Sequence, residues 1–275
     1  MDRFQCKLGF IGTGNMARAL IRGILESQLY EASQIVASDK DKGILDDACS
    51  QFGIRAVYSN AEVVKNAGAI LFCVKPQNMK EVLLEVRDDL ESSHLIISIA
   101  AGISIKTILD TIGKDIPIIR VMPNTPALVQ KGMSGIACGP GSKKEHVDIA
   151  LDIFGSIGEA VIVEEPMLDV VTAVSGSGPG YVFRIMECMV ESAVELGLEE
   201  ELARRLVIQT FVGASHLAKE SGEALSTLRK MVTSPKGTTE AGLFVFEKTG
   251  LRDIIHDVIK AAYNRSIQIK KEWEK

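Results

Sequence analysis

Long apolar segments and an excess of positive charge are both missing from this sequence. Its 275 residues carry a formal net charge of −5, with 46% hydrophobic and 24% charged residues. A protein that binds nucleic acid or an anionic membrane surface needs a basic field, and a membrane-spanning helix needs about 20 consecutive apolar residues. We therefore expect neither nucleic acid nor a membrane as partner. The first strand-like run begins almost at residue 1, which leaves no room for a signal peptide and favours a cytoplasmic protein.

Sequence patterns for metal binding and for covalent catalysis are also missing. There is no H-E-x-x-H pattern, no cluster of metal ligands and no nucleophile elbow. The five cysteines are scattered and form no C-x-x-C pair, as expected of buried thiols in a reducing compartment. The four histidines stand away from the polar loops described below and are interpreted as surface or capping residues. We expect no bound metal and no catalytic cysteine or histidine.

A glycine-rich turn near the start of the chain organises everything that follows it. Cys6–Ile11 is typical of a buried strand, and residues 12–17 continue it in the form G-x-G-x-x-A before a helical pattern. Gly12 permits a tight turn, Gly14 lets a pyrophosphate approach the backbone, and Ala17 lets the helix lie close to the strand. The free amides and positive dipole at the helix start then face the phosphates. The strand before and the helix after favour a dinucleotide site over an ordinary strand-turn-helix.

Apolar runs that alternate with helical patterns follow this turn, as in a doubly wound parallel sheet. The later strands are predicted at residues 34–38, 69–74, 95–99 and 116–121, then 134–139 and 160–163, with turns at 132–135 and 139–141. Ligands of such sheets lie along the carboxyl ends of the strands. Small or polar loops stand at those ends and are expected to meet: 12–17, 38–40, 74–77, 100–102 and 122–125.

The residues after the second predicted strand leave the choice of cofactor open. An acidic side chain at this place accepts hydrogen bonds from the ribose of NAD, whereas a small polar residue near a cation suits the phosphate of NADP. Asp39 stands about 20 residues after the turn, where that acidic side chain belongs, but Ser38 and Lys40 flank it. Alternatively, Asp39 caps the next helix.

Strand-like patterns stop near residue 164, and helical periodicity dominates the rest of the chain. Helices are predicted at 167–174, 179–196, 200–221, 225–231, 238–248 and 251–273. The chain is long enough for two cores, so we expect a nucleotide-binding α/β domain over 1–164 and an all-helical domain over 165–275. Broad faces of these helices lack charge, for example around Phe211 and Leu217. They favour an obligate dimer through this domain, with a self-contained bundle as the alternative.

Two polar breaks lead into helices of the second domain, at 174–181 and 231–241. Each offers free amides and hydroxyls at a helix N-terminus, which suits a carboxylate, although the second break could be only a capped loop. No base that would take a proton from an alcohol is evident. A protonated C=N bond needs mainly positioning against a nicotinamide. The sequence therefore favours a small imino acid as substrate, with the Thr239 hydroxyl near its nitrogen.

These motifs resemble the pyrroline-5-carboxylate reductase family along essentially the whole chain. They are, in order, Gly9-x-x-Gly12-x-Gly14-x-Met16-Ala17, Val74-Lys75-Pro76, Ser98-x-Ala100-Ala101-Gly102, Met122-Pro123-Asn124-Thr125-Pro126, Val174-Ser175-Gly176-Ser177-Gly178-Pro179 and Ser234-Pro235-x-Gly237-x-Thr239. The resemblance implies the last step of proline biosynthesis, in which NAD(P)H gives a hydride to the C=N bond of 1-pyrroline-5-carboxylate. It also implies dimers through the helical domain, often assembled as pentamers of dimers (decamers), with each pocket completed by the partner subunit.

The same resemblance implies site residues in three groups. The pyrophosphate is expected on Gly12, Thr13, Gly14, Asn15 and Met16. The rest of NADP(H) or NAD(H) is expected on Asn60 at the adenosine ribose, on Val74, Lys75 and Pro76 at the nicotinamide ribose, and on Ala100, Met122 and Asn124 beside the nicotinamide, with Ser38, Asp39 and Lys40 as the further candidates above. Substrate is expected on Val232, Ser234, Gly237, Thr238 and Thr239, with Thr239 as the catalytic residue.

Two positions depart from the family pattern. Lys236 stands where the family usually has a small residue, typically glycine, and Gly180 where it usually has alanine. Lys236 is expected either to attract the substrate carboxylate or to point to solvent. The nearest enzyme alternative, a β-hydroxyacid dehydrogenase, has a catalytic lysine in the first long helix of its helical domain, and residues 179–196 contain none. A non-catalytic nucleotide-binding protein would not need the second site at 234–239.

Overall fold

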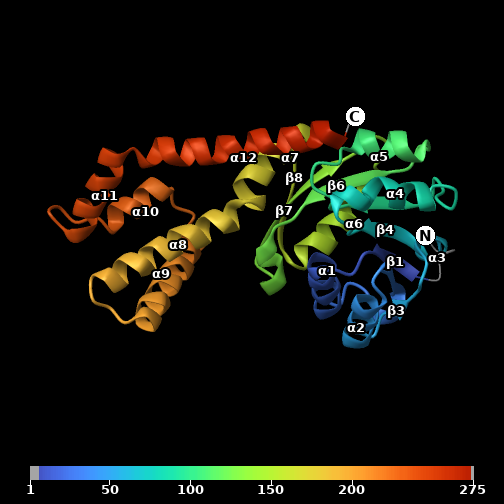
Figure 1. The fold of residues 1–275 in the computed structure, drawn as a ribbon, viewed down its shortest axis with the longest axis horizontal. Coiled ribbons are helices and arrows are strands. Elements are labelled where there is room, and N and C mark those ends of the chain that lie inside the picture. Colours follow the sequence, from blue (N-terminus) through green and yellow to red (C-terminus); the bar gives the residue numbers. More distant parts are fainter. Residues whose placement is uncertain (1–5, 274–275) are drawn as a thin grey trace. The chain divides into compact units, whose positions relative to one another are not determined.

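The computed structural model describes residues 6–273 and divides into two compact units (Figure 1). One unit runs to Ser177 and takes in the chain again from Ala262, and the other is Gly178–Ala261. Strand patterns stop near residue 164, but the segment from 165 to 177 still makes its contacts within the first unit. The residue at which the strand patterns stop, near 164, therefore differs from the residue at which the compact units divide, after Ser177. The domain boundary after residue 164 stays a prediction.

The first unit is built on one sheet, whose described strands run in the order β3-β2-β1-β4-β5-β6-β7-β8. Their bounds are β1 (Cys6–Ile11), β2 (Ile35–Ser38), β3 (Arg55–Ala56), β4 (Ala67–Phe72), β5 (Leu95–Ser98), β6 (Ile118–Met122), β7 (Gly132–Cys138) and β8 (Gly158–Ile162). Neighbouring strands from β3 to β6 pair in parallel, with Ile11 opposite both Ser38 and Phe72. The strand order reverses at β1: the chain adds β2 and β3 on one side of β1, and then β4, β5 and β6 on the other, as in a doubly wound fold. The predicted fold class is confirmed.

Strand β7 departs from the predicted all-parallel sheet. It pairs antiparallel with β6 and parallel with β8. The turn predicted at 132–135 is wrong, because these residues lie in β7. A Cβ at Gly135 would lie 2.9 Å from Cγ1 of Val171, so the glycine lets helix α7 (Leu168–Val171) pack closely on the strand. Glycine here marks a close approach rather than a turn.

Helices cover both faces of the sheet (Figure 1). They are α1 (Asn15–Glu26), α2 (Lys42–Phe52), α3 (Asn60–Asn66), α4 (Pro76–Val86), α5 (Ile105–Ile112) and α6 (Lys144–Gly155), with short turns η1 (Ala32–Gln34), η2 (Thr125–Val129), η3 (Glu165–Met167) and η4 (Thr172–Gly176). One apolar cluster includes Phe10, Leu20 and Phe154, and the other includes Phe72 and Ile108. Adjacent residues of β1 and β4 therefore face opposite clusters, which explains the continuous apolar runs of the sequence.

The second unit consists of helices α8 (Gly178–Glu195), α9 (Glu200–Ser221), α10 (Leu225–Met231), α11 (Thr238–Thr249) and the first part of α12 (Leu251–Trp273). Helices α8, α10 and α11 have no buried residue, and α9 has only Ala203 and Val207. Large apolar side chains stay exposed, with Leu196 at 89% and Phe244 at 69%. These helices do not cover one another as a self-contained bundle would. Apolar surface of this extent is typical of a protein–protein interface.

Helix α12 ends inside the first unit. The Ser266 hydroxyl donates a 2.6 Å hydrogen bond to the Asp169 carboxylate, and both side chains are buried. Trp273 packs against the apolar cluster that contains Phe72. Among residues 6–273, none of the helices combines the length and the apolar character that a membrane span needs.

Candidate active site

The turn between β1 and α1 has a backbone that only glycine adopts without strain. Gly12 has φ +97°, and a Cβ at this position would lie 2.8 Å from the carbonyl oxygen of Cys73 and 3.0 Å from its carbon. The Gly12 amide donates to the carbonyl of Ser38 at 2.8 Å. The turn is therefore fixed against the ends of β2 and β4: Gly12 and Thr13 are buried, and Gly14 and Asn15 are exposed.

Gly14 marks open space at the start of α1. It is the N-cap of this helix and, as a glycine, has no side chain that could cap the first amides. A Cβ added there would meet no described atom within 4 Å. The first amides of a helix need an acceptor, and the positive end of the helix dipole favours an anion. The start of α1 thus fits a phosphate group that approaches the backbone closely.

A cleft of 610 Å³ opens over this turn. The structure brings predicted cofactor residues from separate strand ends together in its wall: Gly12, Gly14, Asp39, Lys40, Asn60, Val74 and Lys75. Such a volume suits a nucleotide-sized ligand. The residues present fit a nicotinamide dinucleotide, although their individual contacts with it stay predictions. Ala100, Met122 and Asn124, predicted beside the nicotinamide, do not line this cleft.

Asp39 is held rigidly beside the turn. Its Oδ2 accepts from the Thr13 amide at 2.7 Å and from the Thr13 hydroxyl at 3.2 Å, and its Oδ1 accepts from the Asp41 amide at 3.0 Å. The cap of α2 is Asp41, whose carboxylate accepts from the Ile44 amide. The alternative that Asp39 caps this helix is therefore wrong. Asp39 instead connects the turn to the end of β2.

Ser38 and Asn60 connect the end of β2 to the start of α3. The buried Ser38 hydroxyl donates to Oδ1 of Asn60 at 2.7 Å, and Nδ2 of Asn60 donates to the Glu85 carboxylate at 2.7 Å. Ser38 therefore orients Asn60 from behind. This role differs from the direct cofactor contact predicted for Ser38, and no sequence pattern pointed to Glu85.

Asn124 and Met122 connect the loop after β6 to the glycine-rich break. Nδ2 of Asn124 donates to the backbone carbonyl and hydroxyl of Ser175, at 3.1 and 3.2 Å, while its Oδ1 accepts from the Met133 amide at 2.8 Å. A Cβ at Gly176 would lie 2.6 Å from Cε of Met122. These contacts give both residues a structural role that sequence reasoning missed.

Neither the Cys73 thiol in the cleft wall nor the buried His94 at the amino end of β5 is suited to acid–base catalysis. Burial raises the pKa of the Cys73 thiol, so it stays protonated at neutral pH. The buried ring of His94 accepts from the Glu91 amide and lies 3.1 Å from the Val64 carbonyl, a purely structural setting. No group of three or more metal-binding side chains occurs in the part of the chain that the structure describes.

The predicted substrate loop forms the start of α11. Gly237 is the N-cap and carries no side-chain hydrogen bond. Its amide donates to the carbonyl of Ser234 at 3.0 Å, and a Cβ there would overlap the Ser234 hydroxyl. The following amides, of Thr238 and Thr239, have no acceptor within residues 6–273. The helix start thus offers free donors to an anion.

Lys236 adopts the left-handed backbone that favours glycine, with φ +59°. Its amide donates to the Glu240 carboxylate at 2.7 Å. This conformation explains why a small residue, typically glycine, is usual at this position in the family that the sequence resembles. A residue with a Cβ pays about 1–2 kcal/mol for it.

We expect Lys236→Gly to raise the free energy of unfolding by up to about 1 kcal/mol, because relief of backbone strain exceeds the added freedom of the unfolded chain. Urea unfolding measures this change. Lys236→Ala removes the same charge but keeps the Cβ, so its free energy of unfolding is not expected to rise. Equal stability of the two variants would contradict the inference that the backbone at Lys236 is strained. A KM raised equally by both variants would mean that the ammonium group attracts the substrate.

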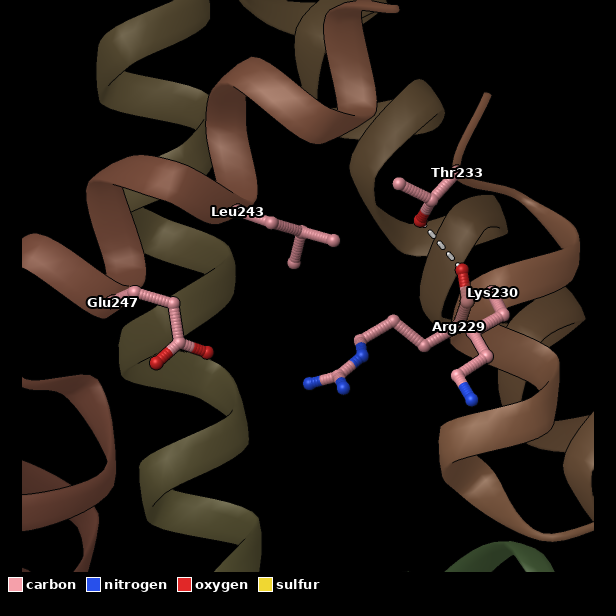
Figure 2. Close-up of a pocket in the computed structure, with 5 residues that line it drawn as sticks. All are labelled: Arg229, Lys230, Thr233, Leu243 and Glu247. Atoms are coloured by element: carbon pink, nitrogen blue, oxygen red, sulfur yellow. Dashed lines mark hydrogen bonds between the residues drawn. The ribbon is translucent and has the colours of Figure 1, made fainter. Parts of the chain in front are cut away.

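A separate pocket of 290 Å³ lies between α10 and α11 (Figure 2). Its lining residues are Arg229, Lys230, Thr233, Leu243 and Glu247, and the Thr233 hydroxyl donates to the Arg229 carbonyl at 2.6 Å. Figure 2 shows Arg229 and Glu247 reaching in from opposite walls. None of the predicted substrate residues lines this pocket, so it is distinct from the start of α11.

Comparison with known proteins accounts for both halves of the chain. Residues 165–269 match the family model described as pyrroline-5-carboxylate reductase dimerisation, and residues 7–102 match that described as NADP oxidoreductase, coenzyme F420-dependent. The chain thus carries a dimerisation domain and an NADP-type domain.

Whole-length relatives agree with these matches. Pyrroline-5-carboxylate reductase of Methanosarcina acetivorans is 38% identical over 97% of this chain and 98% of its own, and that of Pseudomonas aeruginosa is 39% identical over 97% of each.

Solved structures agree as well. A pyrroline-5-carboxylate reductase from Coxiella burnetii has a TM-score of 0.91 at 35% identity, over 96% of this chain and 98% of that one. The enzyme of Plasmodium falciparum, with NADP bound, has a TM-score of 0.86 at 30% identity, over 97% and 99%. A 3-hydroxyisobutyrate dehydrogenase of Mycobacterium tuberculosis, at 12% identity and 0.52 over 98% and 94%, shares the fold alone. The chain therefore belongs to the pyrroline-5-carboxylate reductases, NAD(P)H-dependent oxidoreductases that act on an imine.

Proposed function

We propose that the protein reduces 1-pyrroline-5-carboxylate to L-proline with NAD(P)H bound over the turn at Gly12. The observation that carries this proposal is the glycine turn at the start of α1, which opens onto a nucleotide-sized cleft. The proposed division of labour gives residues 1–164 the cofactor and residues 165–275 dimerisation and substrate binding. The reaction completes proline biosynthesis and is proposed to take place in the cytoplasm.

In this proposal the first amides of α1 bind the pyrophosphate, because they are free and lie at the positive end of the helix. The residues that hold it are Gly12, Thr13, Gly14, Asn15 and Met16. The adenosine ribose is proposed to contact Asp39, Lys40 and Asn60, with Asn60 oriented by Ser38. The nicotinamide ribose is assigned to Val74, Lys75 and Pro76, and the nicotinamide to Ala100, Met122 and Asn124. The bound cofactor supplies a hydride.

The substrate carboxylate is proposed to bind the free amides at the start of α11, where Val232 and Ser234 border the loop. The hydroxyl of Thr239 holds the proton at the ring nitrogen, so that the C=N carbon stays electrophilic. That carbon takes the hydride, the electron pair of the double bond moves to nitrogen, and a secondary amine results. No further proton donor is needed, because the ring nitrogen already carries its proton when the hydride arrives.

The active assembly is proposed to be a homodimer through the helical domain, with a pentamer of dimers as the larger form. Support comes from the exposed apolar side chains of the second unit, among them Phe183 at 58% and Phe246 at 51%. Faces of this kind need a partner in solution.

Loss of the Thr239 hydroxyl is the sharpest test of the proposed chemistry. We expect Thr239→Ala to lower kcat by roughly tenfold to a hundredfold, the range lost when a positioned proton-holding group is removed. Affinity for the cofactor should stay within about twofold, because Thr239 is not among the residues that line the cleft or that are proposed to hold the cofactor. Nicotinamide absorbance measures turnover, and nicotinamide fluorescence without substrate measures binding.

Thr239→Ser is the matched control, because it keeps the hydroxyl and loses only a methyl group. It should retain most of kcat. Equal losses in both variants, or equal losses of turnover and cofactor affinity, would contradict the role of the hydroxyl. A wild-type protein that binds NAD(P)H but never oxidises it with 1-pyrroline-5-carboxylate would instead be a nucleotide-binding protein without this activity.

A further inference from the structure

We propose that this chain binds NADH more tightly than NADPH, and that the Asp39 carboxylate is the group that discriminates between the two cofactors. The inference rests on the proposed function only in taking the cleft as a nicotinamide dinucleotide site. It concerns the adenosine ribose, which carries a free 2′-hydroxyl in NADH and a 2′-phosphate in NADPH.

The first support is the geometry of Asp39. Its carboxylate lines the cleft and is anchored by three donors, the Thr13 amide and hydroxyl and the Asp41 amide. A carboxylate has about four acceptor sites, so at least one site remains for a ribose hydroxyl. A hydroxyl donates to this site, whereas a phosphate has no proton to give at neutral pH and meets a fixed negative charge. The anchoring keeps the carboxylate from turning away.

The second support is the chain of hydrogen bonds from Ser38, the residue before Asp39, through Asn60 to Glu85. The Ser38 hydroxyl donates its hydrogen bond to Asn60, and Asn60 in turn donates to Glu85, which also lines the cleft. Ser38 is 2% exposed and therefore does not serve as the small polar ligand that a ribose phosphate requires. Glu85 and Glu81 add negative charge to the same cleft.

The third support is that two nearby cations, Arg18 and Lys42, already contact other groups of the protein. Arg18 donates Nε to the Thr13 carbonyl, Nη1 to the Asp47 carboxylate and Nη2 to the Ile44 carbonyl. The Lys42 ammonium lies 5.5 Å from the centre of the Tyr58 ring. Lys40 lines the cleft beside Asp39 but is exposed, where a single charge pair contributes little. The cleft is lined by four acidic residues (Asp39, Asp41, Glu81 and Glu85) and two basic ones (Lys40 and Lys75), so its balance of charge opposes an additional phosphate.

The experiment titrates the full-length oligomer with NADH and with NADPH, without imine, and follows nicotinamide fluorescence. For the wild type we expect Kd for NADPH to exceed Kd for NADH by at least about tenfold, which corresponds to about 1.4 kcal/mol. Asp39→Asn keeps an acceptor for the Thr13 amide but removes the charge. It should bind NADPH more tightly, bind NADH more weakly and bring the ratio close to one. Asp39→Ser should move the ratio in the same direction.

Glu81→Gln is the matched control, because it removes a charge from the cleft wall without touching the Asp39 contacts. Its ratio should change by no more than about threefold, the factor expected for a solvent-exposed charge. An equal change in Asp39→Asn and Glu81→Gln would overturn the assignment of selection to Asp39. Wild-type preference for NADPH, lost in Lys40→Ala, would overturn the proposal and make Lys40 the phosphate ligand.

The result is separable from the proposed function. Tight NADH binding that Asp39→Asn reverses, together with no reduction of 1-pyrroline-5-carboxylate, would uphold the preference and refute the reaction. Reduction that proceeds better with NADPH than with NADH would do the opposite.

Discussion

Gly12→Ala is expected to weaken NAD(P)H binding by at least about a hundredfold. At φ +97° an alanine is strained, and its Cβ would lie 2.8 Å from the Cys73 carbonyl oxygen and 3.0 Å from the carbon. Both are backbone atoms at the end of β4, so the turn itself must move, and a displacement of about 1 Å suffices for such a loss. Unfolding should also become easier by about 2–4 kcal/mol, because strain and overlap add. Nicotinamide fluorescence and urea unfolding measure the two effects.

Gly14→Ala separates the site from the fold. Gly14 has φ −68° and no described atom within 4 Å of an added Cβ, so the free energy of unfolding should fall by only about 1 kcal/mol, the cost of alanine at an N-cap. The new methyl group nevertheless occupies the space through which a pyrophosphate would approach the amides of α1. Cofactor affinity should fall by roughly tenfold or more. Normal binding by this variant would place the phosphates elsewhere.

The second large effect concerns stability and lies at the far edge of the sheet. Gly158 faces Gly132 across strands β7 and β8, with φ +149°. A Cβ at this residue would overlap the Gly132 carbonyl oxygen and lie 2.5 Å from its nitrogen. No side chain can rotate to make room, because the obstacle is the paired strand. We expect Gly158→Ala to cost more than about 4 kcal/mol, enough to show as low soluble yield or as a large shift of the urea midpoint.

Gly155→Ala provides a matched control three positions away. Gly155 is exposed, ends α6 and has open space around an added Cβ. Alanine in a helix is favoured over glycine, so this variant should be up to about 1 kcal/mol more stable than the wild type. If Gly158→Ala unfolds no more easily than Gly155→Ala, the close pairing of β7 with β8 is refuted.

Helix positions could be predicted well where a local signal stands at both ends. The predicted helix 105–112 agrees with α5, because Ser104 caps it through the Thr107 amide and Gly113 ends it in the left-handed conformation. The predicted helix 200–221 agrees with α9, which begins after the capping Glu199 and ends at Gly222. The predicted strand 134–139 overlaps β7, but the turn predicted at 132–135 is wrong, because Gly135 lies in the strand and makes a close contact with α7. That contact joins residues far apart in sequence, which no local pattern reveals.

The candidate site divides in the same way. The rule that ligands lie along the carboxyl ends of parallel strands located the cleft, since it needs only the strand order and the loop positions. The dual contacts of Asn124 and the orientation of Asn60 by Ser38 and Glu85 were not predictable. They depend on which polar atoms meet after folding, and in the sequence each of these residues is only a polar residue in or beside a loop.

The last turns of α12 pack within the first unit. Gly102, with φ +77°, accommodates Cγ2 of Ile269 at 2.5 Å from where its own Cβ would stand, and the neighbouring Ala100 is one of the residues predicted beside the nicotinamide. Ser266 anchors the same helical turns to Asp169. Truncation of α12 before Ile269 would therefore take away the side chain that packs on Gly102, so its effect is expected at the loop after β5, which carries Ala100.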